Sequence, residues 1–300
     1  MVYTEIKEIN GKKYYYRVLS VRKNKKVGKK RIYLGVDLEK KKLEKSESLA
    51  DEKLLSLNHI LTKEELDILD KIKEEYRKEP KETLDNRYES FCSLFTHDST
   101  AIEGNTLTLQ ETANLLFENR VPPSKSLREI NETLNHKKAF DYILNYKGEI
   151  TKALILKLHE LVVKDTLKEN LTSQIGTYRK VQVFIRGTNW LPPKPEEVPG
   201  EIGSLLGWYT RNKKILHPLV LSAYFHVAFE TIHPFVDGNG RTGRLLLNFI
   251  LHKNSLPMIN IPNTKKLKYY ECLEEAQVKS NLKPIIRFLF DLIKEQKLRF

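Results

Sequence analysis

Residues 233–244 have the sequence HPFVDGNGRTGR, which combines an imidazole, a carboxylate, three glycines and two guanidinium groups. Apolar residues at helical spacing precede and follow this segment, so it should be a loop between two buried helices. Pro234 disfavours helical backbone at His233 and should end the first helix there. The second helix should start directly after Gly238-Asn239-Gly240, and a helix N-terminus binds anions through its free N–H groups.

The charged side chains of the loop point to the same chemistry. Arg241 and Arg244 are three residues apart and share one helix face. Cations are unfavourable at a helix N-terminus unless an anion is bound there. Asp237 offers the oxygen ligand that Mg²⁺ prefers when it also holds substrate phosphates. Each residue alone is common in ordinary turns, but the combination predicts a site for phosphate and Mg²⁺.

The loop matches HxFx[DE]GNGRxxR, the signature of the Fic (filamentation induced by cAMP) family, which it therefore resembles. Three further segments resemble family segments in the same order: residues 176–179 (GTYR), 181–193 (VQVFIRGTNWLPP) and 269–273 (YYECL). The second of these corresponds to a β-hairpin flap. The resemblance extends over residues 85–298.

The resemblance implies a protein adenylyltransferase, an enzyme that moves AMP from Mg-ATP to a Ser, Thr or Tyr hydroxyl of a target protein. His233 would be the general base, a task suited to its ordinary pKa of about 6.5. Asp237 would hold Mg²⁺, and the flap would pair with the target as an added strand. The implied nucleotide-binding residues are Phe235, Gly238, Asn239, Gly240, Arg241, Thr242, Gly243, Arg244, Val183, Phe184, Ile185, Arg186, Tyr269 and Gln277, the last often Asn in the family.

Residues 99–105 (STAIEGN) resemble the family's inhibitory motif [ST]xxxE[GN], which comprises Ser99, Glu103, Gly104 and Asn105 here. Ser99 and Glu103 are four apart and share a helix face. The resemblance implies that Glu103 pairs with Arg244 and keeps the γ-phosphate from its productive place. A plain helix end at Gly104 is a second, compatible interpretation. The motif precedes the loop, as in relatives with an N-terminal inhibitory helix.

The expected fold is mostly α: a Fic-type helical bundle with a β-hairpin flap and a small N-terminal β appendage. Asn10-Gly11 between two β-rich runs predicts a hairpin. Thr62 with Glu65, and Thr108 with Glu111, predict capped helix starts. The expected parts are a basic β-hairpin or meander (1–45), a linker (46–62), a helical region carrying the inhibitory helix (63–124) and the catalytic core with its closing helices (125–300).

Residues 12–31 hold ten Lys or Arg and no acid, within a chain of net charge +13. Lysines on an edge strand guard against aggregation, and they also suit binding to nucleic acid or an acidic partner. Two cysteines predict neither a disulfide framework nor a zinc site. No signal peptide or membrane-length apolar run is evident, so a cytoplasmic protein is expected.

Other functions are compatible with the same residues. Some Fic enzymes remove AMP, with the inhibitory glutamate positioning the attacking water, and others use a different nucleotide donor. A different class of function is a nucleic-acid-binding module that acts through the basic N-terminus and carries a vestigial loop. The sequence does not identify the target, the trigger that frees Glu103 or a dimer face, although Fic proteins often self-associate.

Overall fold

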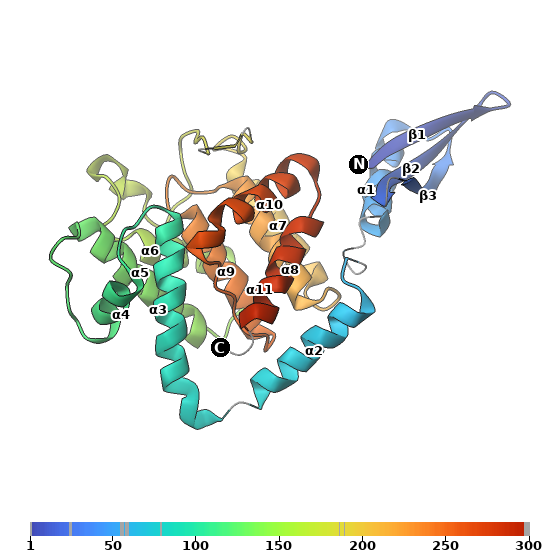
Figure 1. The fold of residues 1–300 in the computed structure, drawn as a ribbon. Coiled ribbons are helices and arrows are strands. Elements are labelled where there is room, and N and C mark those ends of the chain that lie inside the picture. Colours follow the sequence, from blue (N-terminus) through green and yellow to red (C-terminus); the bar gives the residue numbers. More distant parts are fainter. Residues whose placement is uncertain are drawn as a thin grey trace. The chain divides into compact units, whose positions relative to one another are not determined.

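The structure is a computed structural model that describes residues 2–23, 26–54, 57, 60–78, 80–185, 187–188 and 190–296. The chain divides into two compact units, Met1–Leu61 and Thr62–Phe300. Each unit is described by itself below (Figure 1).

The N-terminal unit is a three-stranded antiparallel sheet followed by a helix. Its strands β1 (Val2–Ile9), β2 (Lys12–Lys23) and β3 (Lys26–Val36) lie in chain order. Positive φ angles at Asn10 (52°) and Gly11 (73°) form the predicted tight hairpin. The prediction of a linker over 46–62 was wrong, because helix α1 (Lys40–Leu54) occupies most of it. The sequence of α1 is highly charged and was therefore read as a linker. The helix contacts the sheet, because Glu47 accepts a hydrogen bond from Thr4.

The second unit is helical in its described residues, as predicted (Figure 1). Its helices are α2 (Lys63–Arg77), α3 (Leu84–Ile102), α4 (Leu109–Phe117), α5 (Leu127–Asn145), α6 (Lys152–Val163), α7 (Val198–Asn212), α8 (Pro218–Ile232), α9 (Asn239–Lys253), α10 (Lys266–Lys279) and α11 (Lys283–Gln296), with short 3₁₀ turns η2 (Lys81–Thr83), η3 (Glu169–Gln174) and η4 (Asn263–Lys265).

Capping boxes start several of these helices. The side chain of Thr62 accepts from the N–H of Glu65 and the Glu65 carboxylate accepts from the N–H of Thr62, as predicted. Thr108 and Glu111 form the same pair at α4. Ser126 and Glu129 form a third box at α5 that the sequence analysis did not predict. These caps need only residues three apart, which explains why the sequence reveals them.

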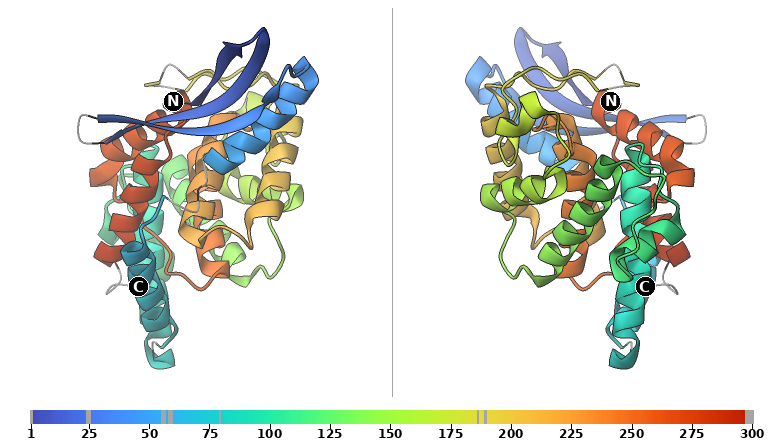
Figure 2. Two further views of the ribbon diagram at one scale, coloured as in Figure 1. Left: turned by 90° about the vertical axis from the view of Figure 1, so that its right-hand side faces the viewer. Right: turned by 90° about the vertical axis from the view of Figure 1, so that its left-hand side faces the viewer.

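The helices α8 and α9 form the centre of this unit. α8 is buried around most of its circumference, which is typical of a helix enclosed by others. It packs along α9 and also contacts α7, α10 and α11, whereas α9 contacts α3, α5 and α6. The pair is coloured in orange shades in Figure 2. The loop that joins α8 to α9 carries the motif of residues 233–244, so the motif is held between the two central helices.

The flap differs from its prediction. Its described residues between 181 and 193 form no strand and appear as a plain yellow trace in Figure 2. The two arms still meet, because the Gln182 side-chain amide donates to the carbonyl oxygen of Pro192 at 3.1 Å. Pro192 and Pro193 lack N–H donors for a strand ladder, which is one physical reason for the loop.

Candidate active site

The loop between α8 and α9 is shaped by two residues with left-handed backbone. His233 (φ 49°) ends α8, and Gly238 (φ 79°) is the N-cap of α9. α9 begins at Asn239, earlier than predicted, because the Gly-Asn-Gly segment forms its first turn rather than preceding it. The N–H groups of Asn239, Gly240 and Arg241 therefore belong to the first helical turn, where a helix binds anions.

The side chain of Asn239 closes the loop. Its oxygen accepts from the N–H of Phe235 at 2.9 Å, and its NH₂ group donates to the carbonyl oxygen of Phe235 at 2.8 Å. Both Asn239 and Phe235 are buried. The side chain of Asn239 thus serves the backbone of the loop. Only the main chain of Asn239 is left to contact a phosphate.

α6 supports the loop through His159. The rings of His159 and Phe235 stack with centroids 3.7 Å apart. The N–H of Gly176 donates to Nδ1 of His159, so Nε2 carries the ring proton and donates to the carbonyl oxygen of Asp237 at 3.1 Å. Burial lowers the pKa of His159 to about 4, which keeps the ring neutral. His159 is thus a positioning residue, and a Cβ on Gly238 would lie only 2.6 Å from Val163 of the same helix.

His233 has the properties of a general base. Its side chain is 22% exposed. Burial lowers its pKa to about 4, so the ring is neutral and able to accept a proton at neutral pH. Nδ1 faces α8, at 3.4 Å from the carbonyl oxygen of Glu230. Nε2 is consequently the nitrogen left for a substrate hydroxyl.

Asp237 suits a Mg²⁺ ion that is bound mainly by substrate phosphates. Its half-exposed carboxylate accepts from the N–H of Gly238 at 2.5 Å and from Arg241 at 3.1 Å, and it lies 3.4 Å from Arg128. No cluster of three or more His, Cys, Asp or Glu occurs among the described residues. A lone carboxylate fits Mg²⁺, which keeps several waters and takes phosphate oxygens.

The two arginines of the loop are buried and already paired. Arg241 contacts Asp237 and lies 3.9 Å from Glu132 of α5. Arg244 donates to the Glu103 carboxylate at 2.8 Å. It also donates to the hydroxyl (3.0 Å) and carbonyl (2.8 Å) oxygens of Ser99. The end of α3 thus supplies the acceptors for the guanidinium of Arg244.

The remaining motif residues fix the end of α3. Gly104 has a φ of 106°, which favours glycine and stops the helix. The amide of Asn105 donates to the carbonyl oxygen of Glu129 at 2.9 Å and to the carboxylate of Glu132 at 3.2 Å. Asn105 therefore fastens the end of α3 to α5, and Glu103 is held beside Arg244 by the fold.

Three residues that were expected to bind the nucleotide, Thr242, Gly243 and Tyr269, lie in the interior of the helical unit. Thr242 is fully buried, and Gly243 packs against Glu230 and His226, so both support the loop from behind. Tyr269 is 1% exposed, and its hydroxyl lies 2.6 Å from Nε2 of His226. The ring of Tyr269 thus packs inside the bundle in this structure. Its neighbour Tyr270 is 39% exposed, and Gln277 is half-buried.

The flap is anchored by the buried Arg179 of the GTYR segment. Its guanidinium donates to the carbonyl oxygens of His233 (2.9 Å), Val181 (3.1 Å) and Pro193. One side chain thus joins both flap arms to the loop of residues 233–244. Val183 and Ile185 are half-buried and Phe184 is 80% exposed, whereas Arg186 lies outside the described residues.

Sequence reasoning missed the roles of Arg179, Glu230 and Arg128. Arg179 stood in the GTYR segment, but its burial and its three carbonyl partners come only from the fold. Glu230 is one turn before His233, but burial of its carboxyl group depends on α9 and α10. Arg128 reaches Asp237 from a helix 109 residues away, which no local pattern predicts.

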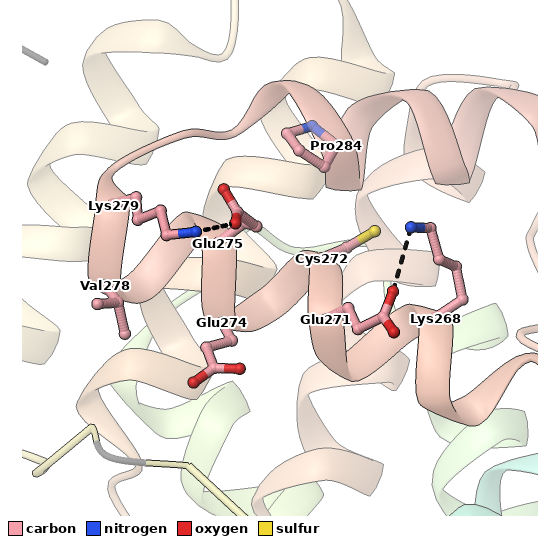
Figure 3. Close-up of a pocket in the computed structure, with 8 residues that line it drawn as sticks. All are labelled: Lys268, Glu271, Cys272, Glu274, Glu275, Val278, Lys279 and Pro284. Carbon is pink, nitrogen blue, oxygen red and sulfur yellow. Dashed lines mark hydrogen bonds and ion pairs between the residues drawn. The ribbon is translucent and has the colours of Figure 1, made fainter.

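A groove between α10 and α11 is separate from this site (Figure 3). Its lining contains no residue of the loop: Lys268, Glu271, Cys272, Glu274, Glu275, Val278, Lys279 and Pro284. Lys268 pairs with Glu271, and Lys279 pairs with Glu275, so both cations of the groove are neutralised.

Among the described helices, none has the length and apolar character needed to cross a bilayer.

Comparisons with known proteins agree with this geometry. The Fic/DOC family matches residues 149–251. A protein adenylyltransferase Fic from Nematostella vectensis is 34% identical over 236 residues, which are 76% of this chain and 54% of that protein. The chain therefore spans about half the length of this curated relative.

Two solved structures share the fold. A Fic-domain-containing signalling protein from Bacteroides thetaiotaomicron has a TM-score of 0.70 at 27% identity, over 78% of this chain and 95% of the other. Fic-1 from C. elegans (residues 134–508) has a TM-score of 0.71 at 25% identity, over 88% and 77%. The chain therefore contains a Fic domain over residues 149–251 and is similar to Fic proteins over most of its length.

Proposed function

We propose that the chain is a self-inhibited protein adenylyltransferase that transfers AMP from Mg-ATP to a hydroxyl side chain of a target protein. The name of the Nematostella relative supports the reaction class. The single observation that carries the inhibition is the 2.8 Å contact between the Glu103 carboxylate and Arg244. The neutral, partly exposed imidazole of His233 beside a helix N-terminus supports the chemistry.

In this mechanism His233 takes the proton of a Ser, Thr or Tyr hydroxyl. The hydroxyl oxygen forms a bond to the α-phosphorus while the bond from that phosphorus to the bridging oxygen breaks, and pyrophosphate leaves. The first N–H groups of α9 stabilise the negative charge on the α-phosphate. Asp237 would hold Mg²⁺, which neutralises phosphate charge when bound. The rate gain comes from positioning and electrostatics.

Inhibition follows from competition for Arg244. In this state its guanidinium is occupied by Glu103 and Ser99, so an outer phosphate of ATP lacks that partner. Charge-assisted hydrogen bonds to a buried guanidinium are strong enough to compete with phosphate oxygens. A Cβ on Gly240 would lie 2.2 Å from the Glu103 carboxylate, so Glu103 sits directly above the first turn of α9.

The test compares wild type, Glu103→Gly and Glu103→Gly/His233→Ala with ATP and Mg²⁺, reading intact mass for added AMP. Glu103→Gly should raise AMP transfer about 10- to 100-fold, because one charge-assisted hydrogen bond contributes roughly 1.5–3 kcal/mol. The double variant should show no transfer. A folded Glu103→Gly protein with no gain would refute the inhibitory role.

Removal of AMP is a second candidate reaction. The Glu103 side chain is 36% exposed, so it can contact a water as well as Arg244. Incubation of an AMP-modified target with wild type and Glu103→Gly separates the two directions. Loss of AMP only with wild type would favour removal. Transfer from a nucleotide other than ATP is tested in the same assay by exchanging the donor.

We also infer an anionic partner, nucleic acid or acidic protein, for the N-terminal unit. Residues 2–36 contain eleven Lys or Arg against two Glu. Tyr33 is 52% exposed and its ring lies 5.4 Å from that of Tyr16. Binding of the full chain to single-stranded RNA should weaken with salt and with Lys12→Gln/Lys13→Gln.

A cytoplasmic location and self-association stay predictions. Self-association can be tested by light scattering.

A further inference from the structure

Glu230 is a buried carboxylic acid between two histidines. It lies on α8, one turn before His233, and is 7% exposed. Its Oε2 is 3.9 Å from Nδ1 of His233, and its Oε1 is 4.0 Å from Nδ1 of His226. Within the described part of the chain, Oε1 of Glu230 and Nδ1 of His226 are buried without a hydrogen-bond partner. Buried unpaired polar atoms are rare and call for a functional reason.

The last glycine of the loop motif makes room for this carboxyl group. A Cβ on Gly243 would lie 2.2 Å from Oε1 of Glu230 and 3.1 Å from the ring of His226. Gly243 has ordinary helical backbone, so backbone freedom does not explain a glycine there. Close approach of α9 to Glu230 explains it. The fold therefore preserves a space for a carboxyl group beside the catalytic histidine.

We propose that Glu230 positions His233 for catalysis, by accepting the Nδ1–H proton on Oε2 and donating from Oε1 to Nδ1 of His226. This inference rests on the proposed function of His233 as the base. Both contacts are about 1 Å longer than hydrogen bonds, and catalytic contacts commonly tighten when substrate binds. The arrangement gives a partner to each of the two unpaired atoms.

The proposed direction of the hydrogen bonds fixes the tautomer of His233. With its proton on Nδ1, the ring presents an unprotonated Nε2 to the target hydroxyl, as a base requires. The main-chain carbonyl of Glu230 is the other acceptor, at 3.4 Å. A second acceptor on the same side keeps the ring from flipping or changing tautomer, which is the third-group role in catalytic triads.

The charged and titratable groups around Glu230 agree with a protonated carboxyl. These are His226 on α8, His233 at the C-cap of α8, Arg244 on α9, Tyr269 on α10 and Glu103 at the C-cap of α3. Burial raises the pKa of Glu230 to about 8, and Arg244 opposes this shift. A neutral acid is both a donor and an acceptor, which the two histidines require. His226 in turn lies 2.6 Å from the Tyr269 hydroxyl.

The experiment uses the full chain with ¹⁵N-labelled histidine, and reads the His233 tautomer by NMR in the absence of ATP. Wild type should carry the proton on Nδ1. Glu230→Gln should keep this state, because an amide has the same donor and acceptor as a neutral acid. Glu230→Leu should shift the proton toward Nε2. Glu132→Gln is the matched control, since its carboxylate is equally buried and does not touch His233.

A second readout is AMP transfer in the Glu103→Gly background. Glu230→Leu should lower kcat roughly 10- to 100-fold with an unchanged KM for ATP, whereas Glu230→Gln should stay within about threefold. Equal activity of the Leu and Gln variants, or an unchanged tautomer in a folded Leu variant, would overturn the proposal. If Glu103→Gly itself transfers no AMP, the proposed function fails, and the tautomer result still decides the role of Glu230.

Discussion

The catalytic loop (233–244) and the flap (181–193) lie side by side but are built in opposite ways. The loop is fixed at several points, by Asn239 on Phe235, by His159 on Asp237 and by the two helices that it joins. The flap is held at its base by Arg179 and Gln182, and Trp190 donates to the carbonyl oxygen of Thr231 on α8, whereas Phe184 is exposed.

The difference indicates a division of labour. A loop that aligns a base and phosphate donors must be rigid, because small displacements cost large factors in rate. A flap whose described main-chain groups form no strand ladder can pair with an incoming strand. The structure therefore supports fixed chemistry beside an adaptable binding edge.

The largest expected effect is the loss of the base. In the Glu103→Gly background, His233→Ala should reduce AMP transfer about 10²- to 10⁴-fold, the usual contribution of a general base. ATP binding, measured by calorimetry, should persist because His233 does not bind phosphate. Parallel loss of ATP binding would mean that His233 shapes the loop instead.

Rigidity of the loop is tested by Gly238→Ala. The added Cβ would lie 2.6 Å from Val163, and a φ of 79° is strained for alanine. The free energy of unfolding should therefore fall by about 1–3 kcal/mol. Gly187→Ala in the flap is the matched control, with a φ of 83° and open space. Its melting temperature should hardly change, because the flap adds little to global stability. An equal loss of stability in both variants would contradict the difference in rigidity between the loop and the flap.

Detachment of the flap is tested by Arg179→Met. Three carbonyl oxygens lose their donor, so the flap arms should separate from the loop and the KM for the target should rise about tenfold. Lys at this position should not restore activity, since a single ammonium cannot replace a planar fork of donors. An Arg179→Met enzyme with normal KM would show that the flap needs no anchor.

The smallest expected effect is that of pH. A base works when unprotonated, and burial lowers the pKa of His233 from 6.5 to about 4. In the Glu103→Gly enzyme, kcat/KM should therefore stay nearly constant from pH 8 down to about 5.5, and fall only as the pH approaches the folded-state pKa. A midpoint of the kcat/KM profile near pH 6.5 would mean that His233 is more exposed to solvent than in this structure.

Local patterns predicted much of this molecule. The capping pairs at Thr62 and Thr108 and the Asn10-Gly11 turn depend on neighbours in sequence, and each is present. The flap and α1 were predicted less well, because their conformations depend on partners elsewhere. Tyr269 stood in a family-like segment, yet only packing between α8 and α11 decides that its ring is buried.

By itself, the sequence determined which chemical groups stand together in the loop, because residues 233–244 are contiguous and their turn is local. Only the tertiary structure decided how those groups are held and perturbed. It brings Glu103 to Arg244 across 141 residues and Arg128 to Asp237 across 109. It also buries Glu230 and half-buries His233, since burial and the pKa shifts that follow from it depend on helices distant in the chain.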